Sequence, residues 1–215
     1  MSNKLRIKKH TTSRQSKNQS QATYEIGNDA VIDQKYLNLP QTVRQELNDL
    51  YDQLAKKPKK VITRLEELKE AYPKVPSIYN YLSVAYSYAD KEKHKAFIKE
   101  NYQQNPKNLF ARCHYAQLCL QQDEPEKIPV IFENKFDLKS LYPRRNRFQP
   151  AEFTSFALVI CLYYLAVGER KKAEEAYEGL QQVAPDSMET RQAKKALKPG
   201  IFKRAGQKII AVVAK

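Results

Sequence analysis

The sequence of residues 150–185, PAEFTSFALVICLYYLAVGERKKAEEAYEGLQQVAP, contains two amphipathic helical patterns separated by one short turn, Gly168-Glu169-Arg170. In each half, apolar residues recur at steps of three and four, which places them on one stripe of a helix. Pro185 ends the second helix, because proline lacks an N–H and disfavours a helical residue before it. The stripe residues are Phe153, Phe156, Ala157, Ile160, Cys161, Tyr164 and Leu165, then Ala173, Ala176, Tyr177, Leu180 and Val183. The stretch therefore predicts a helix-turn-helix hairpin of about 34 residues.

This hairpin resembles a tetratricopeptide repeat. In that family the first helix carries a large residue, a Leu-type residue followed by a small one, and an aromatic; the second carries Ala, an aromatic four residues on, and a closing Pro. The corresponding residues here are Ala157, Ile160, Cys161, Tyr164, Ala173, Tyr177 and Pro185. Ala157 departs from the pattern, which has a bulky residue there. The resemblance implies an all-α fold, a right-handed superhelical solenoid of about three to four such hairpins with a C-terminal capping helix.

The preceding sequence predicts less regular hairpins of the same kind. The first covers about 40–73, with the lysine-rich turn KKPKK between its helices, and the second covers about 76–106. His94 occupies a place where the family has alanine, and we expect it to be a partly exposed packing residue rather than a ligand. The third begins near Leu109 and is interrupted by Pro129. An insertion of about 11 residues then precedes the last hairpin.

The composition favours helices throughout. The chain has only five Gly residues, abundant helix formers and no alternating strand pattern of useful length. Its 14 Tyr residues and absence of Trp indicate that Tyr serves as the aromatic core residue of the repeats. The interpretation requires Tyr86, Ala116 and Tyr164 to lie between adjacent helices rather than in water.

Cysteine usage and the chain ends indicate a cytoplasmic protein. Cys113, Cys119 and Cys161 lie on apolar helical faces with no pairing pattern, so we expect reduced core thiols. The first residues, MSNKLRIKKHTTS, lack the apolar region of a secretory signal. The longest apolar run, at 209–214, is too short to span a bilayer.

The net charge of +14 is concentrated at the two ends. Residues 1–20 carry six bases and no acid, and residues 186–215 carry eight bases and two acids. We predict a flexible basic arm over 1–38, the repeat domain over 39–198 and a basic amphipathic helix over 199–215. The ends either contact nucleic acid or another anionic surface, or are only solvated. The last helix either docks on the repeats or lies on an anionic membrane or partner.

No catalytic chemistry is indicated. The chain lacks a CxxC pair, HExxH, a Gly-rich phosphate loop and a GxSxG elbow. Adjacent helical residues such as Cys113 and His114 point about 100° apart and do not easily share a metal. We therefore predict no enzyme activity, no catalytic residue, no cofactor and no metal. Arg144, Arg145 and Arg147 cluster on a loop between two prolines; they are either a candidate anion-binding group or a solvated loop.

The family resemblance implies a protein-binding scaffold. Its concave groove is lined by the first helix of each repeat and accepts an extended peptide or a partner helix. The candidate partner-binding residues are Asn80, Val84, Ser87, Tyr88, Cys113, Gln117 and Gln121, with Leu158 and Leu162 at the same places in the last repeat. Only Asn80 matches the carboxylate clamp with which some family members bind heat-shock chaperones, which favours a neutral or amphipathic partner segment.

The predicted function is accordingly an adaptor or co-chaperone-like scaffold for protein–protein interaction. One alternative is a nucleic-acid-associated factor that uses the basic terminal segments. Another is a small secretion chaperone with tetratricopeptide repeats. The repeat pattern is informative about the fold and says little about the partner.

Overall fold

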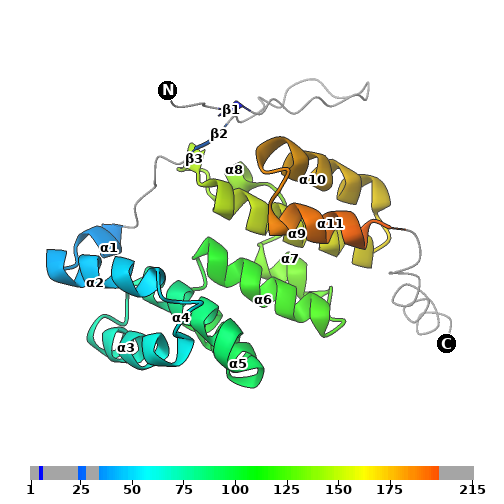
Figure 1. Cartoon of the computed structure of the whole chain (residues 1–215). Helices are drawn as coiled ribbons and strands as arrows, with labels where there is room; N and C mark the ends of the chain where they lie inside the picture. Colours follow the sequence, from blue (N-terminus) through cyan, green and yellow to red (C-terminus); the bar gives the residue numbers. More distant parts are fainter. Residues whose placement is uncertain (1–4, 7–23, 28–33, 199–215) are drawn as a thin grey trace. The chain divides into compact units, whose positions relative to one another are not determined.

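The computed structural model describes residues 5–6, 24–27 and 34–198, and this part of the chain is mostly helical (Figure 1). It divides into two compact units. One, here called the central unit, comprises Ile32–Leu118; the other, the split unit, joins Met1–Val31 to Cys119–Lys215. The prediction of an all-α protein is confirmed.

The helices of the central unit follow the predicted hairpins. They are α1 (Gln34–Leu37), α2 (Gln41–Tyr51), α3 (Pro58–Ala71), α4 (Pro76–Ala89), α5 (Lys91–Gln104) and most of α6 (Leu109–Gln121). Pro58 and Pro76 begin helices α3 and α4, where the missing proline N–H costs no hydrogen bond. Asp90 alone separates α4 from α5, and its carboxylate accepts hydrogen bonds of 3.0 Å from the backbone N–H groups of Glu92 and Lys93.

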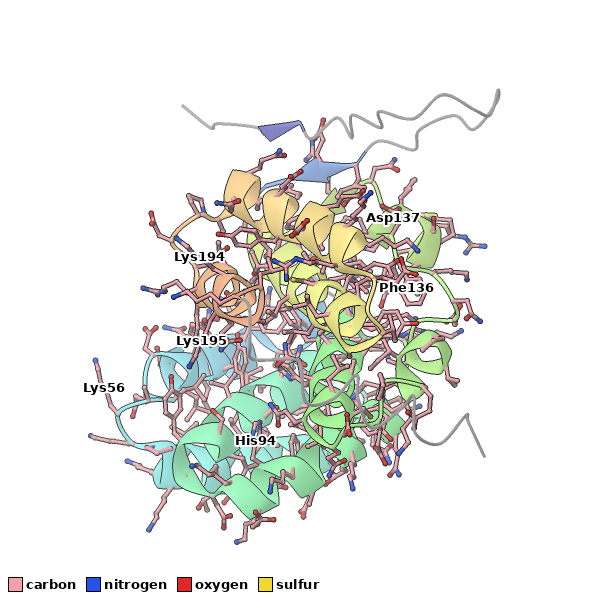
Figure 2. The ribbon with its side chains drawn as sticks, turned by 90° about the vertical axis from the view of Figure 1, so that its right-hand side faces the viewer. Lys56, His94, Phe136, Asp137, Lys194 and Lys195 are labelled. Atoms are coloured by element: carbon pink, nitrogen blue, oxygen red, sulfur yellow. The ribbon has the colours of Figure 1, made fainter. Side chains whose placement is uncertain are left out.

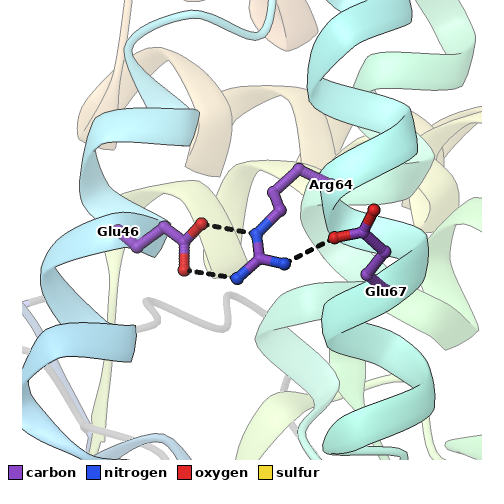
Figure 3. Close-up of polar contacts among 3 residues, drawn as sticks. All are labelled: Glu46, Arg64 and Glu67. Carbon is purple, nitrogen blue, oxygen red and sulfur yellow. Dashed lines mark hydrogen bonds and ion pairs between the residues drawn. The ribbon is translucent and has the colours of Figure 1, made fainter.

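The core of the central unit lies between α2, α3, α4 and α5. Leu47, Leu65 and Leu82 have no exposed surface. At its edge, Arg64 of α3 donates hydrogen bonds of 2.6 and 3.1 Å to the two carboxylate oxygens of Glu46 on α2 and also binds Glu67 (Figure 3). The pair between Arg64 and Glu46 connects the two helices of the first hairpin. Both ion pairs are exposed and add little stability, because solvent screens them.

Two of the three residues expected between helices, Tyr86 of α4 and Ala116 of α6, belong to the central unit. The ring centroid of Tyr86 lies 5.3 Å from that of Phe97, and its hydroxyl donates a 2.9 Å hydrogen bond to Glu66. Ala116 is completely buried. Neither side chain points into water, as the predicted helix packing requires.

The split unit is built around the hairpin predicted from residues 150–185. Its helices are α7 (Lys127–Ile131), α8 (Leu138–Leu141), α9 (Pro150–Ala166), α10 (Arg170–Val183) and α11 (Met188–Ala196). Helices α10 and α11 both pack on α9 (Figure 1). Gly168 has a φ of +80° in the turn, a conformation that favours glycine. Ser187 caps α11 by accepting a 3.1 Å hydrogen bond from the N–H of Thr190.

The second half of the third hairpin is irregular, as Pro129 predicted. Pro129 lies inside α7, which has only five residues. Glu133 and Asn134 follow with positive φ angles of 54° and 56°. Phe132 is fully buried, and its ring meets that of Phe156 edge-on with centroids 5.3 Å apart.

Helix α9 is buried on more sides than one apolar stripe requires. Leu158, expected on an open groove wall, is only 2% exposed, and Leu162 is half-buried. The reason is that α10 and α11 pack on α9, and that Phe132, which follows α7, packs against Phe156 of α9. Tyr164, the third residue expected between helices, lies with its ring centroid 5.9 Å from that of Phe136.

Part of the predicted N-terminal arm has a defined structure. Strand β2 (Glu25–Ile26) pairs in parallel with β3 (Arg147–Phe148) and antiparallel with β1 (Leu5–Arg6). Ile26 is only 5% exposed, and the ring of Tyr24 meets that of Phe148 edge-on at 5.3 Å. A flexible arm over the whole of 1–38 is therefore incorrect for these strands and for α1, whereas most of 1–33 lies outside the described residues, as does the predicted helix over 199–215.

Candidate functional site

Helix α4 carries four of the predicted partner-binding residues. Tyr88 is 59% exposed, and Ser87 is also exposed, with its hydroxyl bonded to the carbonyl of Val84 at 2.7 Å. Val84 is half-buried and packs against the core of the central unit. Asn80 is half-buried, and its Oδ1 atom accepts no hydrogen bond from the described residues. Tyr88 therefore provides most of the apolar surface on this face.

The three residues predicted on α6 have different surroundings. Gln117 is half-buried and Gln121 is exposed. Cys113 has no exposed surface, which removes it from any wall that a partner reaches. Its small apolar side chain suits the core, in agreement with the expectation of buried thiols. Gln121 belongs to the split unit, so of the two exposed or half-buried residues only Gln117 is in the same unit as the α4 residues; the buried Cys113 is also in that unit.

A buried hydroxyl group lies between two imidazole rings in the central unit. The Oγ atom of Ser83 is 3.4 Å from His94 Nε2 and 3.4 Å from His114 Nδ1. Burial lowers the pKa of His94, and burial together with the charge of His94 lowers the pKa of His114 to about 4. Both rings are therefore neutral at pH 7, and these long contacts are weak hydrogen bonds.

Sequence reasoning missed this cluster. Ser83 fits the small-residue place of a repeat, and His94, labelled in Figure 2, was expected only to pack. The partners of Ser83 lie 11 and 31 residues away, on α5 and α6. No local pattern indicates such a contact, because it depends on how three helices pack. No carboxylate is bonded to either ring among the described residues, so the cluster lacks the orienting group of a catalytic triad.

Two of the three clustered arginines bind carboxylates of the chain itself. Arg145 donates hydrogen bonds of 3.0 and 2.7 Å to the two oxygens of Glu152, and its guanidinium lies 4.3 Å from the centre of the Phe148 ring. Arg147 binds Glu25 at 3.2 Å, and Arg144 is exposed. The predicted anion-binding group therefore already holds internal carboxylates, which an external anion would have to displace.

Comparisons with models of protein families, with curated proteins and with solved structures gave no match. The resemblance to tetratricopeptide repeats thus stays a prediction from the residue pattern. Among residues 5–6, 24–27 and 34–198, no helix combines the length and apolar character needed to cross a bilayer. Within those same ranges, His, Cys, Asp and Glu side chains form no group of three that is able to hold a metal ion.

Proposed function

We propose that the chain is a scaffold for protein–protein interaction whose hairpins stack as a right-handed superhelix of tetratricopeptide type. An extended peptide or a partner helix binds in a groove lined by α4 and α6. The observation that carries this proposal is Tyr88, which is 59% exposed on the face of α4 that the repeat pattern assigns to the groove. Exposed tyrosines supply a large contact area at low entropy cost, and they are enriched among residues that dominate binding energy.

The buried contact between Ser83 and His114 brings α4 and α6 close to each other. Both helices run antiparallel to α5 through short connections, so they run parallel to each other. Ser87 lies about one turn beyond Ser83, and Gln117 about one turn beyond His114. The polar side chains of Ser87 and Gln117 therefore lie near the same level as Tyr88, and a neutral or amphipathic segment fits them best.

The cytoplasmic location is part of the same proposal, supported by three buried cysteines that form no disulfide. The two alternatives, binding of nucleic acid by the terminal segments and a secretion chaperone, stay predictions. Residues 1–20 and 199–215, which carry most of the terminal charge, lie almost entirely outside the described residues.

The test compares wild-type protein with the double variant Tyr88→Ala, Gln117→Ala in quantitative affinity capture from a cell extract. Val130→Ala is the matched control, because Val130 is 76% exposed and lies in the split unit. We expect the double variant to lose captured partners by about ten-fold or more, which corresponds to about 1.4 kcal/mol, and the control to keep them. If the double variant, with unchanged circular dichroism, retains everything that wild type captures, the groove is not the binding site.

A further inference from the structure

Exposed lysines gather at one end of the central unit. The turn between α2 and α3 and the first residues of α3 and α5 contribute six of them, here called the lysine edge. They are Lys56, Lys57, Lys59, Lys60, Lys91 and Lys93, all exposed. Figure 2 shows Lys56 pointing away from the body of the protein. Charge counted along the sequence hides this edge, because acidic residues elsewhere in the repeats offset it.

Helix packing brings the two groups of lysines together. Helices α3 and α5 both pack on α4 and both run antiparallel to it, so they are parallel to each other. Lys69 of α3 binds Glu100 of α5 at 3.0 Å, and it lies 5.4 Å from the centre of the Phe97 ring. Lys69 and Glu100 occupy similar distances from the starts of their helices. The starts of α3 and α5 therefore lie at the same end of the unit.

Two of the acidic groups near the lysine edge in sequence, Asp90 and Glu92, are already engaged, whereas Asp52, four residues before Lys56, is exposed. The carboxylate of Asp90 caps α5, and Glu92 pairs with Lys95 at 2.8 Å. Arg64, which lies about one turn after Lys60 on α3, forms ion pairs with Glu46 and Glu67 (Figure 3). By contrast, none of the ion pairs among the described residues involves a lysine of this edge. Its charges are therefore open to an external anion.

An exposed aromatic ring precedes the lysine edge along the chain. Tyr51 ends α2, five residues before Lys56, and is 56% exposed. Its ring centroid is 5.1 Å from that of Tyr81, so one side of the ring is supported and the rest is open. The turn that follows is held by the buried side chain of Leu54, whose N–H bonds the carbonyl of Tyr51 at 3.2 Å. The turn that connects Tyr51 to the first lysines of the edge is thus ordered.

We infer that the lysine edge and Tyr51 bind single-stranded nucleic acid. The lysines contact backbone phosphates, and Tyr51 stacks on an unpaired base. Ammonium groups act as point charges without a fixed hydrogen-bonding fork, so the binding is independent of base sequence. An acidic protein segment would match the charge equally well, but it offers no reason for a supported, open aromatic ring beside the lysines. The proposal uses other residues than the groove residues Tyr88 and Gln117.

The experiment measures fluorescence anisotropy of a labelled uridine oligonucleotide of about 16 nucleotides with the full chain over a range of salt concentrations. The edge variant combines Lys59→Gln, Lys60→Gln, Lys91→Gln and Lys93→Gln. The control variant removes the same charge from exposed lysines of the split unit, which lie on α10, on α11 and two residues after α11. Figure 2 shows Lys194 and Lys195 at the surface there. Its substitutions are Lys171→Gln, Lys194→Gln, Lys195→Gln and Lys198→Gln.

We expect the edge variant to bind the oligonucleotide at least about ten-fold more weakly than wild type. The slope of log binding constant against log salt concentration should become shallower by about 2 to 3, since each lost phosphate contact contributes about 0.7. Tyr51→Ala should weaken binding by about ten-fold, while Tyr51→Phe should retain it, because stacking needs the ring and not the hydroxyl. Equal losses in the edge and control variants would overturn the proposal, since binding would then follow total charge. Competition by polyglutamate as strong as that by unlabelled oligonucleotide, with no effect of Tyr51→Ala, would instead identify an acidic protein segment as the ligand.

Discussion

Mild acid should destabilise the central unit through His114. The ring of His114 lies 3.4 Å from the hydroxyl of Ser83, which lies 3.4 Å from the ring of His94. Burial, and then the charge of His94, lower the pKa of His114 from the ordinary 6.5 to about 4. Folding therefore holds this imidazole neutral at pH values where the unfolded chain would protonate it.

The sign and size of the effect follow from proton linkage. Between pH 6.5 and about 4 the unfolded chain binds more protons at this site, so stability falls as pH falls through that window. Well above pH 6.5 the ring is neutral in both the folded and the unfolded chain, so this loss is absent. A pKa difference of about 2.5 corresponds to about 3 kcal/mol in the free energy of unfolding, of which about 2 kcal/mol should be lost by about pH 5.

Urea unfolding followed by far-UV circular dichroism between about pH 7.5 and 4.5 measures this loss. The comparison is with His114→Gln, which is neutral at every pH and keeps a hydrogen-bonding group near Ser83. Carboxylates titrate in both proteins, so the difference between the two curves isolates the histidine. His94→Gln should shrink the loss, because removing the charge of His94 lets the pKa of His114 rise.

Two results would refute this reasoning. One is a parallel fall in stability with pH for wild type and His114→Gln. The other is a nuclear magnetic resonance titration in which the folded His114 imidazole protonates near its ordinary pKa of 6.5. Either would mean that the ring is hydrated in the folded protein and that Ser83 does not share an enclosed space with it.

Two further predictions concern stability, both checked by chemical unfolding. Glu152→Gln should lower the free energy of unfolding by about 2 kcal/mol, because it leaves the mostly buried Arg145 without its bidentate carboxylate. Arg147→Gln breaks only the exposed pair with Glu25 and should cost less than about 1 kcal/mol. Equal costs for the two variants would contradict this difference. Leu65→Ala should cost about 2–5 kcal/mol, because Leu65 is fully buried, whereas Thr63→Ala at an exposed position of α3 should change stability by less than about 0.5 kcal/mol.

The helices were predictable because their signals are local. The apolar steps and the closing Pro185 indicated α9 and α10, and Pro58 and Pro76 marked the starts of α3 and α4. The pairing of β2 with β3 was not predictable. It joins Glu25 to a residue 122 positions away, through strands of two residues that show no periodic pattern.

The candidate site was only partly predictable for the same reason. Periodicity places Tyr88 and Cys113 on equivalent faces of their helices, yet Tyr88 is open to solvent and Cys113 is completely buried. Burial depends on what packs against each face, which the order of residues in one helix does not reveal.

By itself, the sequence determined the helices, their turns and caps, and the burial of the thiols, because hydrogen bonding and amphipathic spacing act over a few residues. Only the tertiary structure decided that Ser83 lies between two histidines and that lysines about 30 residues apart share one end of the central unit. Parallel packing of α3 and α5 aligns their starts, and contacts of this kind depend on distance in space rather than distance along the chain.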